Sequence, residues 1–285
     1  MSRLCFRGEA EAIPDPEARA KAIANADRYA NRSTLRPLKD LQLIQAIRPW
    51  LRGEEGGLCR RETNVLTAQG AALVQAWYDE EGKGRHLRWS PSLLELDGTN
   101  QAHAEAIVDV YVAFTRAVTP PLLFWGWKDD RELARLAGEG GTTLRTGIPD
   151  AVFVLSRPRD EGYDHLPCFV EVDRGTETVW AGDGRKRDWK GKIERYEAYF
   201  AGPVHHDPLF RGMERCPLVL SLTTSPRRLE NLLAATVTVT TSDRYAFATL
   251  DALLETGSRT VLDEALWRMP GEASVRPLRE LLDGF

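Results

Sequence analysis

The chain has 285 residues, of which 42% are hydrophobic and 28% charged, and its formal net charge at pH 7 is −4. This length and composition indicate a soluble globular protein with one large or two ordinary domains. The negative net charge argues against a protein that binds polyanions over its whole surface, so local basic patches must supply any phosphate contacts.

The four cysteines are far apart and contain no C-x-x-C pair: Cys5, Cys59, Cys168 and Cys216. We therefore expect neither a zinc ribbon nor a disulfide framework, but reduced thiols in the cytoplasm. No apolar run approaches the length that spans a membrane, and the N-terminus lacks the apolar segment of a signal peptide. Membrane association is not expected.

In the N-terminal part, apolar residues recur at every third or fourth position from Leu41 to Leu51, which predicts an amphipathic helix. Residues 58–65 have the composition of a strand, and Thr67 is suited to cap a second helix that runs through Trp77. A charged segment, residues 79–89, follows. This order of helix, strand, helix and basic ribbon fits a winged-helix module.

The basic side chains of the charged segment are either a wing that touches DNA or an exposed hairpin tip. As a wing, these long cations would hold phosphates and give affinity with little sequence information. The candidate DNA-binding residues here are Lys83, Arg85 and Arg88. No clear recognition helix precedes the strand, so the module either binds DNA or mediates a homodimer.

A domain boundary is predicted at Thr119-Pro120-Pro121, where paired prolines follow the helical pattern from His103 to Arg116. We therefore predict a winged-helix-like domain, residues 1–118, and a second domain, residues 119–285. The second domain begins with an apolar run, and Asp129-x-x-Glu132 then fits the capping box of a short helix.

Two apolar runs, residues 151–155 and 167–172, flank a polar loop and predict an antiparallel hairpin. Asp150 opens the first strand, while Glu171 and Asp173 close the second and share one face. Directly opposed β-carbons lie about 5 Å apart. Three carboxylates this close repel one another unless a cation lies among them, and their hard oxygen atoms suit Mg²⁺ or Mn²⁺. The hairpin thus predicts a metal site at these three residues.

A helical pattern begins near Asp188 and places Lys192 and Tyr196 on one face. Its predicted buried stripe is Trp189, Ile193, Tyr196 and Phe200. Lys192 at the edge of the stripe either reaches a scissile phosphate as a point charge or is a solvated lysine.

Basic residues surround this central stretch. The run Arg185, Lys186, Arg187 and Lys190 is either a track for the DNA backbone or a mobile charged loop. Arg174 either contacts phosphate or forms an ion pair with Asp173.

The C-terminal part begins with a continuous apolar run, residues 216–223, which predicts an internal strand. Ser225-Pro226 then caps a helix to about residue 235. Arg227 and Arg228 lie in its first turn, against the helix dipole, which indicates either an anionic partner nearby or exposed arginines. The remaining segments predict a strand over residues 237–241 and helices over residues 245–254, 262–269 and 275–282.

The order Pro149-Asp150, Glu171-x-Asp173 and Lys192 resembles the PD-(D/E)xK nuclease superfamily. The run from Phe169 to Glu177 with Lys192-Ile-Glu-Arg-Tyr196 is similar, more narrowly, to the bacterial replication-relaxation family. Those proteins are associated with plasmid and mobile-element DNA and usually carry a winged-helix N-terminal part. In this chain Asp173 occupies the position of the usual motif lysine, so Lys192 would have to replace that lysine from the helix.

This resemblance implies an α/β (α+β) fold in which a central mixed sheet is flanked by helices. It also implies a Mg²⁺-dependent endonuclease or nickase that acts on DNA, expected to be double-stranded. In nucleases of this type an acidic residue on the preceding helix often completes the metal shell, and Glu132 is the candidate. The implied catalytic set is Asp150, Glu171, Asp173, Lys192, Glu132 and Tyr196. The alternative is a DNA-binding regulator that keeps the nuclease fold without activity.

Overall fold

The computed structural model describes residues 13–47, 50–52, 58–60, 63–82, 98–144, 147–175, 179, 188–255 and 261–283. The chain divides into two compact units, residues 1–105 and 106–285. None of the helices in the described residues combines the length and the apolar composition that a membrane span needs.

The first unit contains short strands and peripheral helices. These elements are α3 (Pro16–Tyr29), the π-helical η1 (Ala30–Leu35), α4 (Arg36–Asp40), β1 (Ile44–Ile47), β2 (Trp50–Arg52), β3 (Leu58–Arg60), β4 (Thr63–Leu66) and α5 (Ala68–Glu80). Strand β1 pairs antiparallel with β4, and β2 pairs antiparallel with β3. As predicted, Thr67 caps α5: its hydroxyl oxygen accepts a hydrogen bond from the backbone nitrogen of Gly70 at 3.1 Å.

The helix predicted from Leu41 to Leu51 is wrong, because this segment contributes strands β1 and β2. The apolar spacing fits a helix, but Pro49 would interrupt one in its last turn. Ile44 and Ile47 are β-branched and favour a strand once a partner is available. Pairing with β4 provides that partner, and tertiary pairing overrides the local pattern.

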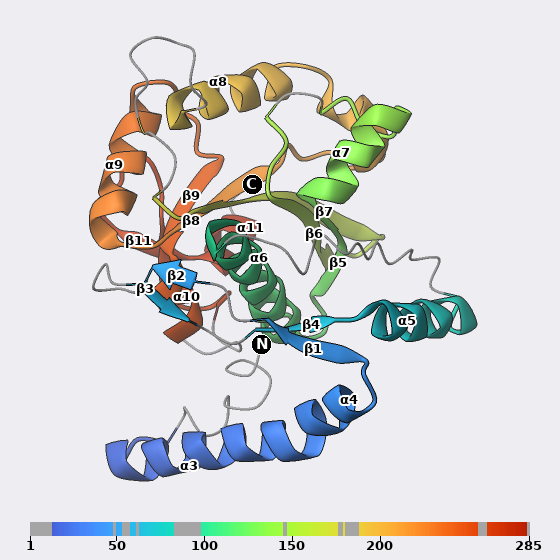
Figure 1. Ribbon diagram of the computed structural model, residues 1–285. Helices are drawn as coiled ribbons and strands as arrows, with labels where there is room; N and C mark the ends of the chain where they lie inside the picture. The colour runs from blue at the N-terminus through green and yellow to red at the C-terminus, as the bar shows by residue number, and fades with distance from the viewer. Residues whose placement is uncertain are drawn as a thin grey trace. The chain divides into compact units, whose positions relative to one another are not determined.

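The described residues of the second unit form a seven-stranded mixed sheet with helices on both faces (Figure 1). The strand order is β11-β10-β9-β8-β7-β6-β5. The strands are β5 (Leu123–Asp129), β6 (Ala151–Pro158), β7 (Tyr163–Asp173), β8 (Leu218–Thr223), β9 (Tyr245–Thr249), β10 (Ala265–Arg268) and β11 (Val275–Pro277). Strands β7, β8 and β9 run parallel, and the other neighbours pair antiparallel. The predicted α/β fold class is confirmed.

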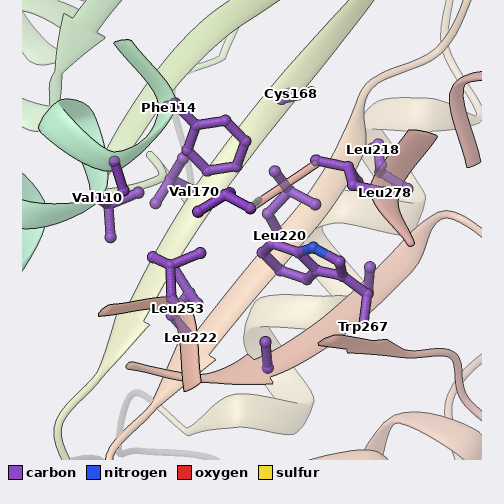
Figure 2. Packing of buried hydrophobic residues seen from close by; sticks show 14 of the residues in the cluster. Val110, Phe114, Cys168, Val170, Leu218, Leu220, Leu222, Leu253, Trp267 and Leu278 are labelled. Carbon is purple, nitrogen blue, oxygen red and sulfur yellow. The ribbon is translucent and has the colours of Figure 1, made fainter. Parts of the chain in front are cut away.

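One face of the sheet packs against α6 (Gly98–Ala117), α10 (Leu250–Glu255) and α11 (Leu278–Asp283). Figure 2 shows Val110 and Phe114 of α6 in one cluster with Val170 of β7 and Leu220 of β8. The alternate residues of β7 and β8, such as Phe169, face the opposite side.

The opposite face packs against α7 (Asp130–Glu139), α8 (Trp189–Phe200) and α9 (Pro226–Val237), and η3 (Val204–His206) and η4 (Pro208–Phe210) lie between α8 and β8 in the chain. Parallel neighbours require crossover connections, and α8 and α9 are the crossovers from β7 to β8 and from β8 to β9. Because such crossovers are right-handed, both helices cover the same face of the sheet.

Three predictions for the C-terminal segment are wrong. Residues 237–241 do not form a strand, because α9 continues to Val237. Residues 245–249 form β9 rather than the start of a helix, and residues 265–268 form β10. Strand β9 lies inside the sheet with Tyr245, Ala246 and Phe247 all fully buried. A strand buried on both faces has no alternation, so periodicity does not separate it from a buried helix.

Candidate functional site

Strands β6 and β7 place Asp150 beside Glu171. Ala151 pairs with Val170, so the antiparallel ladder brings the preceding residue of β6 next to the following residue of β7. One carboxylate oxygen of Asp150, Oδ2, accepts a hydrogen bond from the backbone nitrogen of Val172 at 2.7 Å. The predicted antiparallel hairpin is confirmed, and it fixes the first two carboxylates side by side.

Helix α8 brings Lys192 and Tyr196 to Glu171. The Lys192 ammonium lies 2.7 Å from Glu171 Oε2, and its side chain is only 15% exposed. The Tyr196 hydroxyl donates a hydrogen bond to Glu171 Oε1. The Lys192 side chain is therefore largely shielded from solvent and paired with Glu171, while its contact with a phosphate stays a prediction.

The position of α8 follows from its sequence. Asp188 caps the helix by accepting a hydrogen bond from the backbone nitrogen of Gly191 at 2.8 Å. The predicted buried stripe is confirmed, and burial of each large apolar side chain stabilises the packed helix by about 1.5–3 kcal/mol. Trp189 also donates a hydrogen bond from Nε1 to Thr236 Oγ1 of α9 at 2.9 Å. These contacts fix the position of α8 along the sheet, and with it the position of Lys192 next to Glu171.

Glu171 is only 1% exposed, and ionisation of its carboxyl group is therefore costly. Burial and the negative charge of Asp150 raise the pKa of Glu171 to about 7, against the opposing effect of Lys192 and the hydrogen bond from Tyr196. Burial and the neighbouring Glu171 raise the pKa of Tyr196 well above its usual value. Tyr196 thus stays protonated and orients the carboxylate as a hydrogen-bond donor.

Asp173 shares the face of Glu171, as predicted, but its charge is balanced by an arginine. Arg228 of α9 donates from Nε to Asp173 Oδ2 at 2.6 Å and from Nη2 to Oδ1 at 3.1 Å. The hydroxyl of Thr223 donates to Oδ2 at 3.2 Å. Arg228, noted in the first turn of its helix, therefore has the anionic partner that its position indicated.

The acidic residues at the start of α7 differ in whether they contact Asp150. Asp129 caps the helix by accepting from the backbone nitrogen of Glu132 at 2.8 Å. The Glu132 carboxylate lies 3.0 Å from Lys128 Nζ and is 41% exposed. Asp130, in contrast, donates from its backbone nitrogen to the backbone oxygen of Asp150 at 3.0 Å.

Asp130 was not predicted as a site residue, because its neighbour Asp129 already explains the acidic pair as a helix cap. Its pKa is raised by partial burial and by the negative charges of Asp129 and Asp150. The sequence signal that could have identified Asp130 is a second carboxylate directly after β5, the strand that pairs with β6. Asp130 rather than Glu132 is the acidic residue of α7 that interacts electrostatically with Asp150.

A sequence model of the replication-relaxation family matches residues 17–208 of this chain. The chain belongs to the replication-relaxation family. Neither the curated proteins nor the solved structures include a match to it. Membership supports a role in the replication of plasmids or mobile elements. The matched segment of this replication-relaxation protein contains Asp150, Glu171 and Lys192, and ends before Thr223 and Arg228.

Most of the predicted DNA-contacting residues of this replication-relaxation protein lie outside the described residues: Lys83, Arg85, Arg88, Arg185, Lys186 and Arg187. Lys190 lies in the first turn of α8, 3.8 Å from Glu194 and 41% exposed. Arg174 directly follows Asp173 and is half-buried. Their DNA contacts stay a prediction.

Two carboxylates of the site fit a divalent cation better than three. Mg²⁺ keeps several of its waters and uses one or two carboxylates together with substrate phosphates, which matches Asp150 and Glu171 on adjacent strands. Asp173 fits less well, because a single arginine holds both of its oxygens in a bidentate pair. The oxygens of Glu171 accept separately from Lys192 and Tyr196, so a cation would have to displace only one of these two donors. Among the described residues, no three His, Cys, Asp or Glu side chains gather as a metal-binding group. The ligand roles of all three acids stay predictions.

Proposed function

We propose that this replication-relaxation protein is a Mg²⁺-dependent DNA endonuclease or nickase. The observation that carries the proposal is the 2.7 Å contact of Lys192 Nζ with Glu171 Oε2, next to Asp150. It supplies the lysine that the motif lacks at position 173. Two carboxylates can hold a cation and a lysine can stabilise developing negative charge, and both are suited to metal-assisted phosphodiester hydrolysis.

In this proposal Asp150 and Glu171 would hold the cation, and a bound Mg²⁺ would polarise the scissile phosphate. Each carboxylate is held in place by the protein: Asp150 by Val172 and Glu171 by Tyr196. Lys192 would orient a water or stabilise the charge that develops on the phosphorane-like transition state. Because its ammonium is largely shielded from solvent, this stabilisation would exceed that of an exposed lysine.

The test is conversion of supercoiled plasmid to the nicked form in Mg²⁺ or Mn²⁺. We expect Asp150→Asn, Glu171→Gln and Lys192→Met each to lower the rate by about 10²-fold or more, the size of a lost electrostatic contact to the transition state. Lys21→Met is the control, since it removes an exposed lysine of α3 that belongs neither to the candidate site nor to the predicted DNA contacts. Loss of activity in the control as well would contradict the assigned role of Lys192.

The second candidate is a DNA-binding regulator without nuclease activity. The Asp173–Arg228 pair favours this regulator, because the position of the motif lysine is occupied by an aspartate whose charge Arg228 neutralises. Wild-type protein that binds plasmid DNA equally well in EDTA and in Mg²⁺, and that nicks it in neither Mg²⁺ nor Mn²⁺, would decide for the regulator.

A further inference from the structure

Ser221 of β8 carries a buried hydroxyl group that the hydrogen bonds of the fold leave unused. The residue is 2% exposed. Its Oγ has no hydrogen-bond partner among the described residues. A buried hydroxyl without a partner costs about 1–3 kcal/mol, so such groups are rare in native proteins and point to a water or an ion.

The sheet places this hydroxyl beside the candidate site. In the parallel pairing of β7 with β8, Ser221 is the partner of Glu171. Neighbouring strands lie about 5 Å apart, and partners on one face project in the same direction. On its other side Ser221 is the partner of Phe247, whose ring contacts Trp189 with centroids 5.8 Å apart. An apolar wall therefore lies on one side of the hydroxyl and the carboxylate of Glu171 on the other.

The next row along the same strands has a satisfied counterpart. Thr223 follows Ser221 by two residues on the same face and is the partner of Asp173. Its hydroxyl donates to Asp173 Oδ2 at 3.2 Å. In the row of Ser221, both oxygens of Glu171 already accept from Lys192 and Tyr196. The two donors to the Glu171 carboxylate thus come from α8, and the neighbouring serine hydroxyl is not one of them.

We propose that Ser221 is a further residue of the metal site, whose hydroxyl binds a water of the hydration shell of the cation held by Glu171. The inference rests on the proposed function. Mg²⁺ and Mn²⁺ keep part of their hydration shell in such sites, and a hydroxyl one strand away is placed to hold one of those waters. Ser221 is a positioning residue in this role, since it acts through the water.

The experiment measures binding of Mn²⁺ alone, without DNA, by calorimetry of the full chain. We expect Ser221→Ala to weaken Mn²⁺ binding by about 10-fold, the lower end of the effect of partners that orient metal ligands, and Ser221→Thr to restore part of it. Ser156→Ala is the control, because Ser156 is a buried serine at the opposite end of β6.

Thermal unfolding without metal separates this role from a packing role. The Ala variant loses an unpaired hydroxyl, so its Tm is expected to equal or exceed that of the wild type. Unchanged Mn²⁺ affinity in Ser221→Ala overturns the inference and leaves the nuclease proposal standing if plasmid nicking persists. Absence of Mn²⁺ binding in the wild type overturns both.

Discussion

Glu171 is the residue at which burial, charge and hydrogen bonding meet in this site. It is buried beside Asp150, yet it is in contact with an ammonium and a phenol hydroxyl. The balance raises its pKa to about 7, so near neutral pH its carboxyl group is part protonated and part ionised. A bound divalent cation would therefore shift the protonation state of Glu171, since its charge favours the ionised form of the carboxyl group.

Protein stability in the absence of metal should record this raised pKa. An unfolded glutamate has a pKa of about 4.3, so between that value and about 7 the folded state binds more protons than the unfolded state. The contribution of Glu171 to the free energy of unfolding is full below pH 4 and is lost as the pH rises through 7, a change of up to about 4 kcal/mol. Denaturant unfolding at pH 5 and pH 8 measures it.

Glu171→Gln is the reference for that measurement, because it has no proton to exchange. The wild type is expected to lose more stability than this variant from pH 5 to pH 8. Parallel curves for the two proteins would show that the glutamate is not protonated in the folded state at pH 5.

At the scale of elements, the end of β7 is tied to β8 and α9 through Asp173. Arg228 is 16% exposed on its side chain and Asp173 4%, so the pair is largely shielded from water. A bidentate arginine–carboxylate pair of this kind is strong, and removal of one partner leaves the other buried and unpaired. The pair therefore links α9 to the carboxyl end of β7, next to the candidate site.

A double-mutant cycle distinguishes this pair from a metal ligand. We expect Asp173→Asn and Arg228→Gln each to lower the free energy of unfolding by about 2–3 kcal/mol, and the double variant by much less than the sum. If Asp173 is instead a ligand, Asp173→Asn weakens Mn²⁺ binding while Arg228→Gln does not. Equal and small Mn²⁺ effects in both variants identify the structural pair.

The elements that could be predicted are those with a local signal. The β6–β7 hairpin follows from two apolar runs around a polar loop, and α8 from a 3.6-residue stripe behind a capping aspartate. Arg228 and Ser221 reach the site only through the parallel order of β7 and β8, which no local pattern contains. Orphaned hydroxyls and distant ion pairs depend on tertiary packing, so the candidate site was predictable only where Asp150, β7 and α8 form it.

At the scale of the whole molecule, the candidate site lies within the second unit, and the predicted wing belongs to the first. The family match covers parts of both units and ends before β8, so it does not include strands β8 to β11 of the sheet. The net charge of −4 means that DNA binding depends on local basic groups rather than on the overall field. In the first unit, the predicted wing supplies these local basic groups.

Replacement of Lys83, Arg85 and Arg88 by alanine tests that assignment. If all three side chains hold phosphates, the slope of log K against log salt concentration becomes less steep by about 2–3, since each phosphate contact contributes about 0.9. Binding of a duplex measured from 50 to 300 mM salt, by fluorescence anisotropy, gives the slope. Replacement of Lys21, Arg32 and Arg36 by alanine is the matched control. These residues of the first unit are exposed, and their replacement removes the same three positive charges. An equal loss of slope in the control would assign the effect to net charge, whereas a loss confined to the first triple assigns it to contacts at the wing.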